Sequence, residues 1–466
     1  MKSIKMRGIC AAVTGALLFG FGANAMADST TDIVNALVAK GVLTEEEGAL
    51  LNKGREGEAA GQAKAMKKAS KLSVSDAIDN AKIYGDIRAR YERRDGNLVS
   101  NGVSEDVNRS RYKITLGVET KAGDWYSDLA FAMSDNGRSD NVSFGEITSP
   151  YSKDKSGIYI KRAMLGWNVT PWLSVEAGRM KNPLYMVNAM VFDHDIVFEG
   201  VQEKLNYKVG ETNLFANLGQ WVYTGLGVGT NTDVATTQRQ NMVLAFQAGA
   251  QQAFNDRTSA KAAVGYYNYT GQSTTSVGGL TGVTTAKFNP TAVDNVTRGV
   301  NNLQILDVLG EANYMATSSI GVRPYAEYAV NTDASARQKA AGVAGSKDDN
   351  AWLVGVTVGS AKDLKSFEAK KMGKGDWSAN LWYQSVGAYA LDANSVDTDI
   401  FDGRINMEGT SFKAQYNVED NVALNFTGAW GDRKNDQYAT VSGAKVDVPG
   451  NIKSLNLYQF DVTYKF

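Results

Sequence analysis

Few residues in this chain are suited to covalent chemistry. Its single histidine, His194, stands between Asp193 and Asp195, and its single cysteine is Cys10. One histidine and one cysteine leave little material for thiol catalysis, a zinc site or an iron–sulfur cluster. His194 could activate water or a serine, but the sequence supplies no nucleophile with a third, orienting group beside it. We therefore expect no enzyme, no metal and no cofactor, and keep a hydrolase centred on His194 as an alternative.

Charged residues spaced two apart are more informative. Arg88 and Arg90 alternate with Ile87 and Ala89, and the same alternation recurs across 109–120. Successive side chains of a β-strand point to opposite faces, so this spacing predicts strands with one apolar and one polar face. In the segment 158–169, Lys161 and Arg162 are adjacent. We expect one of these two to point outward or to reach the rim.

Sixteen segments carry this period of two. Their expected bounds are 81–93, 109–120, 125–133, 158–169, 172–179, 200–209, 213–221, 241–253, 258–270, 303–315, 320–329, 351–360, 376–386, 409–418, 422–430 and 454–466. Short and long connections alternate between them, which is typical of an outer-membrane barrel with short turns at one end and long loops at the other. The connection 361–375 is long where a short turn is due. Either a neighbouring strand is misplaced or that turn is extended.

The first 80 residues differ from the rest. Residues 1–27 have the order of a signal peptide: basic residues, an apolar run, and a small-residue cleavage site at Ala25-Met26-Ala27. Residues 28–80 have helical spacing and predict a short α-helical periplasmic segment, a plug for the lumen, or a partly ordered leader. The formal net charge of -1 argues against nucleic acid as a partner. The sequence thus predicts an all-β fold over 81–466, a transmembrane antiparallel β-barrel of about 16 strands.

The last strand carries a family resemblance. Tyr464 and Phe466 end an alternating segment that resembles the C-terminal signal read by the barrel-assembly machinery of Gram-negative bacteria. Together with the segments 178–183 and 193–195, the architecture over 81–466 resembles the Putative porin family, with a more distant likeness to phosphate-selective porins. The resemblance implies a bacterial outer-membrane location, contact with lipid and lipopolysaccharide, and a homotrimer.

A barrel of this size leaves an aqueous channel, so the polar faces of its strands would line water. The basic residues expected in the lumen are Arg88, Arg90, Arg111, Lys113, Arg162, Arg179 and Arg323. The acidic residues expected there are Glu119, Glu176, Asp307, Glu311 and Glu327. The connection 180–199 is the third long loop and is unusually apolar. We expect it to fold into the barrel and to set Asp193, Asp195 and Glu199 against the basic wall, narrowing the channel.

The sequence favours a porin that passes small hydrophilic solutes and ions by passive diffusion. Its mixed charges predict weak selectivity, although arginines can bind phosphate through paired hydrogen bonds, and an anion- or phosphate-selective porin stays open. A surface adhesin or receptor barrel is a further alternative, because the long loops at 271–302 and 331–350 could carry such a role.

Overall fold

The computed structural model describes the barrel and part of its loops. The described residues are 44, 46, 78–98, 104–134, 140–145, 156–224, 241–270, 303–335, 348–360, 373–392, 395–397, 399–403, 405–435 and 452–466. The expected signal peptide (1–27) lies outside them, as does nearly all of the expected helical segment (28–80). Among the described residues, no helix has the length and apolar content needed to cross a membrane.

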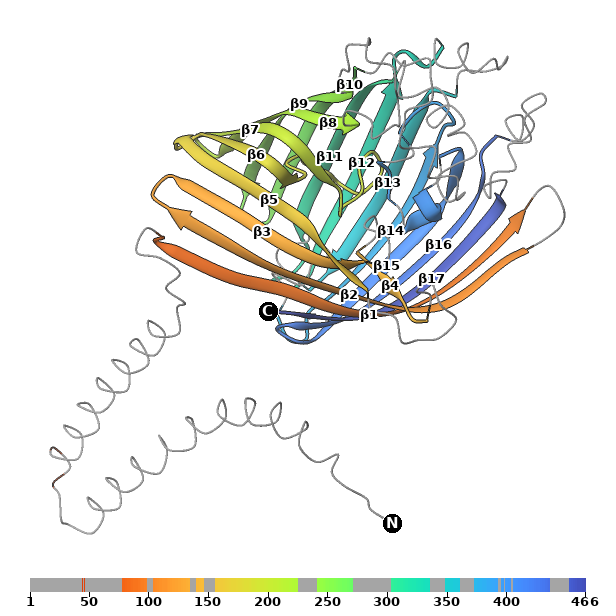
Figure 1. Ribbon diagram of the computed structural model, residues 1–466, viewed down its shortest axis with the longest axis horizontal. Coiled ribbons are helices and arrows are strands. Elements are labelled where there is room, and N and C mark those ends of the chain that lie inside the picture. The colour runs from red at the N-terminus through yellow and green to blue at the C-terminus, as the bar shows by residue number, and fades with distance from the viewer. Residues whose placement is uncertain are drawn as a thin grey trace, which may run out of the picture. The chain divides into compact units, whose positions relative to one another are not determined.

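Sixteen long strands form one closed, tilted barrel (Figure 1). They are β1 (Asn80–Leu98), β2 (Ser104–Ala122), β3 (Trp125–Ser134), β5 (Gly157–Thr170), β6 (Leu173–Lys181), β7 (Val197–Val209), β8 (Thr212–Thr224), β9 (Asn241–Asn255), β10 (Thr258–Tyr269), β11 (Gln304–Met315), β12 (Gly321–Asn331), β13 (Asn350–Gly359), β14 (Trp377–Val386), β15 (Met407–Glu419), β16 (Val422–Arg433) and β17 (Ile452–Lys465). The two-residue strand β4 (Val142–Ser143) pairs with β2 inside a loop. A short 3-10 helix, η1 (Ile400–Gly403), precedes β15.

Closure comes from the pairing of β1 with both β2 and β17. Both pairings are antiparallel, with Arg90 level with Arg111 on one side and with Asp461 on the other. Every backbone edge is therefore satisfied, as a membrane-spanning sheet requires. The predicted sixteen-stranded antiparallel barrel is confirmed. Strands flank the long connection 361–375 where they were expected, so that turn is extended and no strand is misplaced.

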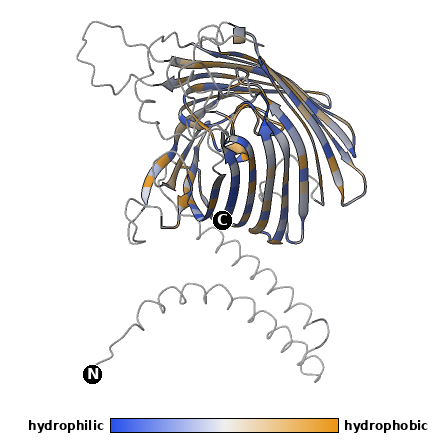
Figure 2. Ribbon diagram, turned by 90° about the vertical axis from the view of Figure 1, so that its right-hand side faces the viewer, coloured by the Kyte–Doolittle hydropathy of each residue, from blue (hydrophilic) through white to orange (hydrophobic). Residues whose placement is uncertain are grey.

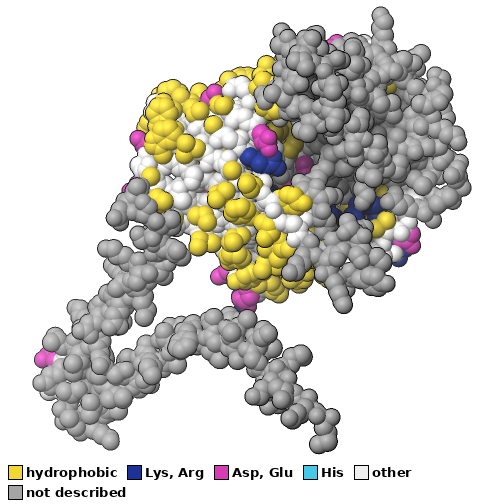
Figure 3. All heavy atoms as spheres, viewed as in Figure 1, with side chains coloured by type: hydrophobic (Ala, Val, Ile, Leu, Met, Phe, Trp, Pro, Cys, Tyr) yellow, Lys and Arg dark blue, Asp and Glu magenta, His cyan; other side chains and the backbone are white. Residues whose placement is uncertain are grey.

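The outer face of the barrel is apolar. Large side chains such as Ile87, Leu116, Phe131 and Phe460 are exposed on it, and colour alternates along the strands in Figure 2. On the face in Figure 3, apolar side chains cover much of the described wall and charged groups are few. Lipid satisfies no charge, and a lysine or arginine facing the bilayer centre costs about 2–4 kcal/mol. This cost fixes which face of each strand points outward.

A β-bulge on β5 breaks the strict alternation at Lys161. Arg162 is level with Ala130 on β3, whereas the next paired residues are Ile160 and Phe131, so Lys161 is the extra residue. Neither side chain points outward, because a bulge lets two consecutive side chains lie on the same side, and the expectation of an outward-pointing residue is wrong on that point. Lys161 pairs with Asp140, and Arg162 pairs with Asp128 at 2.7 Å.

The inner wall has two chemically different halves. From β7 to β14, and near the loop-side ends of β15, β16 and β17, it carries buried apolar side chains that form one continuous core with two inward-folded loops. On β1, β2 and the rest of β17, most buried inner residues are charged or amide side chains. The barrel is therefore packed against protein on one side and lined by charge on the other.

Candidate functional site

The connection between β6 and β7, residues 182–196, folds into the barrel. Its apolar side chains Met190, Val191 and Phe192 are almost fully buried in the core. The ring of Phe192 meets the ring of Tyr267 on β10 edge to face, at 5.0 Å between centroids. These side chains would be poorly solvated outside the barrel, and burying them drives the loop against the wall.

Polar contacts fix the backbone of this loop. Gln247 of β9 exchanges two hydrogen bonds with the main chain of Tyr185, at 2.8 and 2.9 Å. Arg323 of β12 donates from Nη2 to the carbonyl oxygen of Val187 at 2.8 Å and from Nε to Glu311 at 2.6 Å. The loop is thus pinned by the wall at two separate points.

A second loop, the connection 387–406 between β14 and β15, also folds inward. Its apolar residues Leu391, Ile400 and Phe401 are buried in the same core as the first loop. The amide of Asp193 donates to the carbonyl oxygen of Ser395 at 2.7 Å, which joins the two loops. Sequence reasoning missed this loop, although its run of apolar residues beside acids resembles the first loop and could have revealed it.

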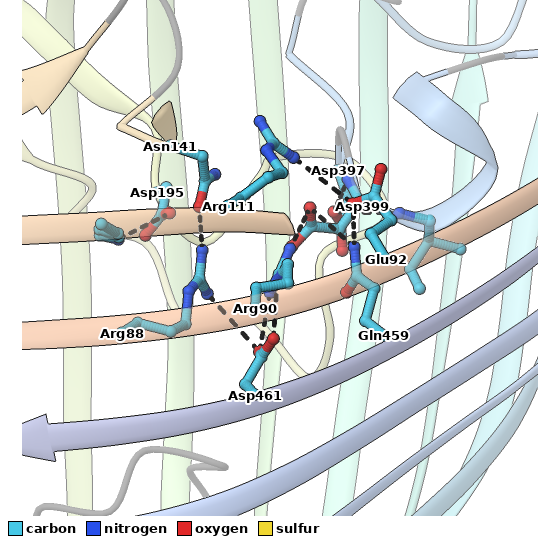
Figure 4. A network of polar contacts seen from close by, with 12 residues as sticks. Arg88, Arg90, Glu92, Arg111, Asn141, Asp195, Asp397, Asp399, Gln459 and Asp461 are labelled. Atoms are coloured by element: carbon cyan, nitrogen blue, oxygen red, sulfur yellow. Dashed lines mark hydrogen bonds and ion pairs between the residues drawn. The ribbon is translucent and has the colours of Figure 1, made fainter. Parts of the chain in front are cut away.

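Together the two loops present acids toward the charged wall. Arg90 of β1 donates to Asp399 of the second loop at 2.9 Å and to Asp461 of β17 at 2.7 Å. Arg88 donates to Asn141 at 2.5 Å and lies 3.9 Å from Asp461. Figure 4 shows both arginines between Asp461 on one side and Asn141 and Asp399 on the other.

The first loop reaches the same wall through Asp195. Its carboxylate lies 3.2 Å from the amine of Lys113 on β2, and its side chain stays more than half exposed. The positive charge of Lys113 holds the pKa of Asp195 well below its usual range. Asp195 is therefore a permanent negative charge on the loop.

Asp193 behaves differently. Its enclosed position, together with the negative charges of Asp397 and Asp195, raises its pKa to about 7. Burial also raises the pKa of Asp397, whereas Arg90 holds that of Asp399 low against the effect of its own burial. The loop acids thus include two permanent charges, Asp195 and Asp399, and one acid, Asp193, with a pKa of about 7.

Above Arg90, the wall holds a fully buried acid that sequence analysis did not single out. Glu92 is 0% exposed and accepts contacts from Arg94 at 3.3 Å, Arg109 at 2.5 Å and Arg111 at 3.4 Å. Gln459 of β17 donates to it at 2.9 Å. One carboxylate among three guanidinium groups fixes their direction across neighbouring strands.

Several expected lumen residues lie beneath the first loop. Asp307, Glu311, Arg323 and Glu327 are on the inner face of β11 and β12, each 6% exposed or less. Arg323 and Glu311 form a buried pair that supports the loop. These side chains are covered by the loop and do not line open lumen.

Others lie toward the end of the barrel that carries the short turns. Arg162 pairs with Asp128, Glu176 pairs with Lys204, and Glu119 lies 3.4 Å from Lys181. All of these residues except Arg162 line a cavity below the first loop.

Arg179 and Glu199 are the exceptions and need correction. Met180 and Phe198 point into the core, so their neighbours Arg179 and Glu199, which pair in register, lie on the outer face. Arg179 contacts Glu199 at 2.5 Å, and both are partly exposed there. The alternation of β6 and β7 places them outside, away from the expected constriction.

The chain is similar to a known protein family and to several solved structures. A family model described as Putative porin matches residues 99–307. Among solved structures, the chain is similar to OprB of Pseudomonas putida, with 12% identity, a TM-score of 0.48, and coverage of 83% of this chain and 94% of that one. It is also similar to the outer-membrane channel DcaP of Acinetobacter baumannii, with 15% identity, a TM-score of 0.42, and coverage of 84% and 99%. Among curated proteins, none matches the chain.

The closed barrel with an apolar exterior defines a β-barrel channel of the bacterial outer membrane. The match to the Putative porin model over residues 99–307 supports a porin channel and agrees with the resemblance expected from the sequence. Fold and family favour a channel over an enzyme. Among the described residues, no group of three or more His, Cys, Asp or Glu side chains is placed to hold a metal ion.

Proposed function

We propose that this porin passes small hydrophilic solutes and ions by passive diffusion through a constriction between the two inward loops and the charged wall of β17, β1 and β2. The observation that carries the proposal is the position of Arg90, between Asp399 of the second loop and Asp461 of the wall. The half of the lumen behind the loops is filled by the apolar core, so the water path runs along the charged half.

The charges at the constriction favour weak selectivity. Cations on β1 and β2 face acids on the loops, and most of the guanidinium groups are already paired with a carboxylate. Opposed charges across a narrow section create a transverse field that orders dipolar solutes without strongly excluding either sign of ion. We therefore prefer a mixed, weakly selective pore to a phosphate-selective one, and assign no covalent step to His194.

The proposal includes the expected assembly and partners. Tyr464 and Phe466 would act as the signal for the barrel-assembly machinery. The apolar exterior would contact outer-membrane lipid and lipopolysaccharide, and three copies would form a homotrimer. Support for the lipid contact is the exposed apolar face, whereas the trimer rests on the family resemblance.

Reversal potentials in a salt gradient across a planar bilayer test the constriction. We expect Arg88→Ala/Arg90→Ala to shift ion preference toward cations, because two positive charges are lost. We expect Asp195→Asn/Asp399→Asn to shift it toward anions, because two negative charges are lost. Lys374→Gln, which changes a charge outside the lumen, is the control. If both charge variants show the same ion preference as Lys374→Gln, the assignment of the constriction is refuted.

A further inference from the structure

Below the first loop, the charged wall encloses a cavity that the constriction does not use. It has a volume of about 550 Å³ and is lined by the start of β1, the end of β2, and parts of β3, β5, β6 and β7, with Asn182 and Pro183 of the loop. Cavities of roughly 300–1,000 Å³ hold small molecules in proteins. It lies toward the end of the barrel that carries the short turns, which in outer-membrane barrels faces the periplasm.

Three acids line this cavity, and each contacts a cation. Glu119 lies 3.4 Å from Lys181. Asp128 contacts Arg162 at 2.7 Å and Lys181 at 3.3 Å. Glu176 pairs with Lys204 and accepts a hydrogen bond from Tyr126 at 2.7 Å. Each buried carboxylate thus has its own cation, and neither is available to bind a positively charged solute.

Two lysines of the lining have no such partner. Lys82 of β1 and Lys121 of β2 are exposed to the cavity, and neither amine forms an ion pair with any residue that the structure describes. Lys82 is level with Glu119, two residues from Lys121, so the two lysines are diagonal neighbours on one face of the sheet. The cavity therefore has an excess of positive charge, which attracts anions.

The cavity also contains an unsatisfied hydrogen-bond acceptor. Gln202 of β7 is 1% exposed, and its amide nitrogen donates to Glu176 and to the carbonyl oxygen of Lys181. Its Oε1 accepts no hydrogen bond from any described residue. A buried acceptor without a donor is unfavourable, and a ligand hydroxyl can donate to it.

We propose that this cavity is a binding subsite for small hydroxylated organic anions of sugar-acid size, on the periplasmic side of the constriction. The carboxylate would lie between Lys82 and Lys121, and a hydroxyl would donate to Gln202 Oε1. The subsite rests on the proposed function, because a solute reaches it only if the barrel conducts. It would slow the passage of such anions and enrich them over neutral solutes of the same shape.

The test uses three solutes of similar size and different charge: gluconate, glucose and glucosamine. Each is added to one side at a time of single full-length channels in a planar bilayer, and interruptions of the current are counted. We expect gluconate to interrupt the current at lower concentration than glucose or glucosamine, and more effectively from the short-turn side.

Variants assign the effect to the cavity. Lys82→Gln/Lys121→Gln should raise the half-blocking concentration of gluconate by about fivefold, since each exposed charge pair contributes about 0.2–1 kcal/mol, and should leave glucose unchanged. Gln202→Met should weaken block of the current by gluconate. It should leave block by butyrate unchanged, because butyrate has no hydroxyl. Lys374→Gln, an exposed lysine at the same end paired with Glu419 at 2.7 Å, is the matched control and should change nothing.

The outcomes separate the two proposals. Channels that conduct but show equal block by all three solutes, or gluconate block that survives the double lysine substitution, overturn the subsite and leave the porin function standing. A chain that inserts and conducts nothing overturns the proposed function itself. Because both lysines are exposed, the single variants provide the same test should the double variant insert poorly.

Discussion

The two halves of the inner wall are built from the same alternating strands but carry different inward-facing side chains. On β7 to β14 the inward positions hold residues such as Trp221, Tyr267 and Leu353, which two loops cover. On β1, β2 and β17 they hold Arg90, Arg111 and Asp461, whose side chains form ion pairs with one another or with acids of the wall and the second loop. An inward face of a wide barrel can be apolar only where protein shields it from water. The position of the loops therefore decides where the channel runs.

The largest predicted effect comes from weakening the packed half. Met190→Ala/Phe192→Ala removes two side chains from the core, and such truncations each cost about 2–5 kcal/mol. The first loop should then leave the wall, so that single-channel conductance rises and the current becomes noisier. Leu381→Ala, on the outer face, is the matched control. Unchanged conductance in the core variant would show that the loop does not narrow the channel.

Breaking the buried ion pair beneath the loop should have the next largest effect. Arg323→Met leaves Glu311 buried without its cation, which typically costs 3–5 kcal/mol. The temperature at which the folded barrel is lost in a heat-shift gel should fall clearly. Arg323→Met/Glu311→Met, which removes both charges, should recover much of that loss. A double variant less stable than the single one would contradict this account of the pair.

The charged half should respond to pH through Asp193. With a pKa of about 7, Asp193 is protonated below neutral pH and ionised above it. Cation preference should therefore weaken as pH falls from 8 to 6, and Asp193→Asn should remove that dependence. In the folded loop Asp193 stays protonated up to about pH 7, whereas an unfolded Asp loses its proton near pH 4. Because the folded state binds the extra proton, the contact between the two loops weakens as the pH rises from about 4 to about 7. Reversal potentials at three pH values measure the first effect, and a flat wild-type profile would refute it.

The smallest effect is expected on the outer face. Arg179→Ala removes an exposed pair with Glu199 outside the lumen, and exposed pairs contribute about 0.2–1 kcal/mol. Ion selectivity should not change, in contrast to the Arg88→Ala/Arg90→Ala variant. A shift in ion selectivity as large as that of the Arg88→Ala/Arg90→Ala variant would show that Arg179 lies in the lumen.

Much of the fold could be predicted from the sequence because membrane strands repeat one rule. Lipid outside gives every strand an apolar outer face, and many inner positions are polar, so the period of two is visible along the chain and all sixteen strands were located within a few residues. The bulge at Lys161 could not be located, because a single extra residue leaves no distinct pattern in one sequence. The inward turn of the first loop was foreseen from its apolar residues, and the structure places it there.

The site was predictable only in part. Arg88, Arg90 and Lys113 follow from alternation alone, because they lie in the middle of regular strands. Asp399 could not be predicted in this way, because it lies in a loop and reaches the wall only where that loop folds inward. Arg179 and Glu199 were misplaced because the expected loop was taken to begin before β6 ends, which hid their outward register.

One measurement tests most directly whether water runs along the charged half. A cysteine is placed either at Arg88, on the charged wall, or at Ala263, in the core beneath the loops, and a negatively charged thiol reagent is added during single-channel recording. The account predicts a stepwise, irreversible loss of current for Arg88→Cys and none for Ala263→Cys. Rapid modification at Ala263 with an inert Arg88→Cys channel would contradict it.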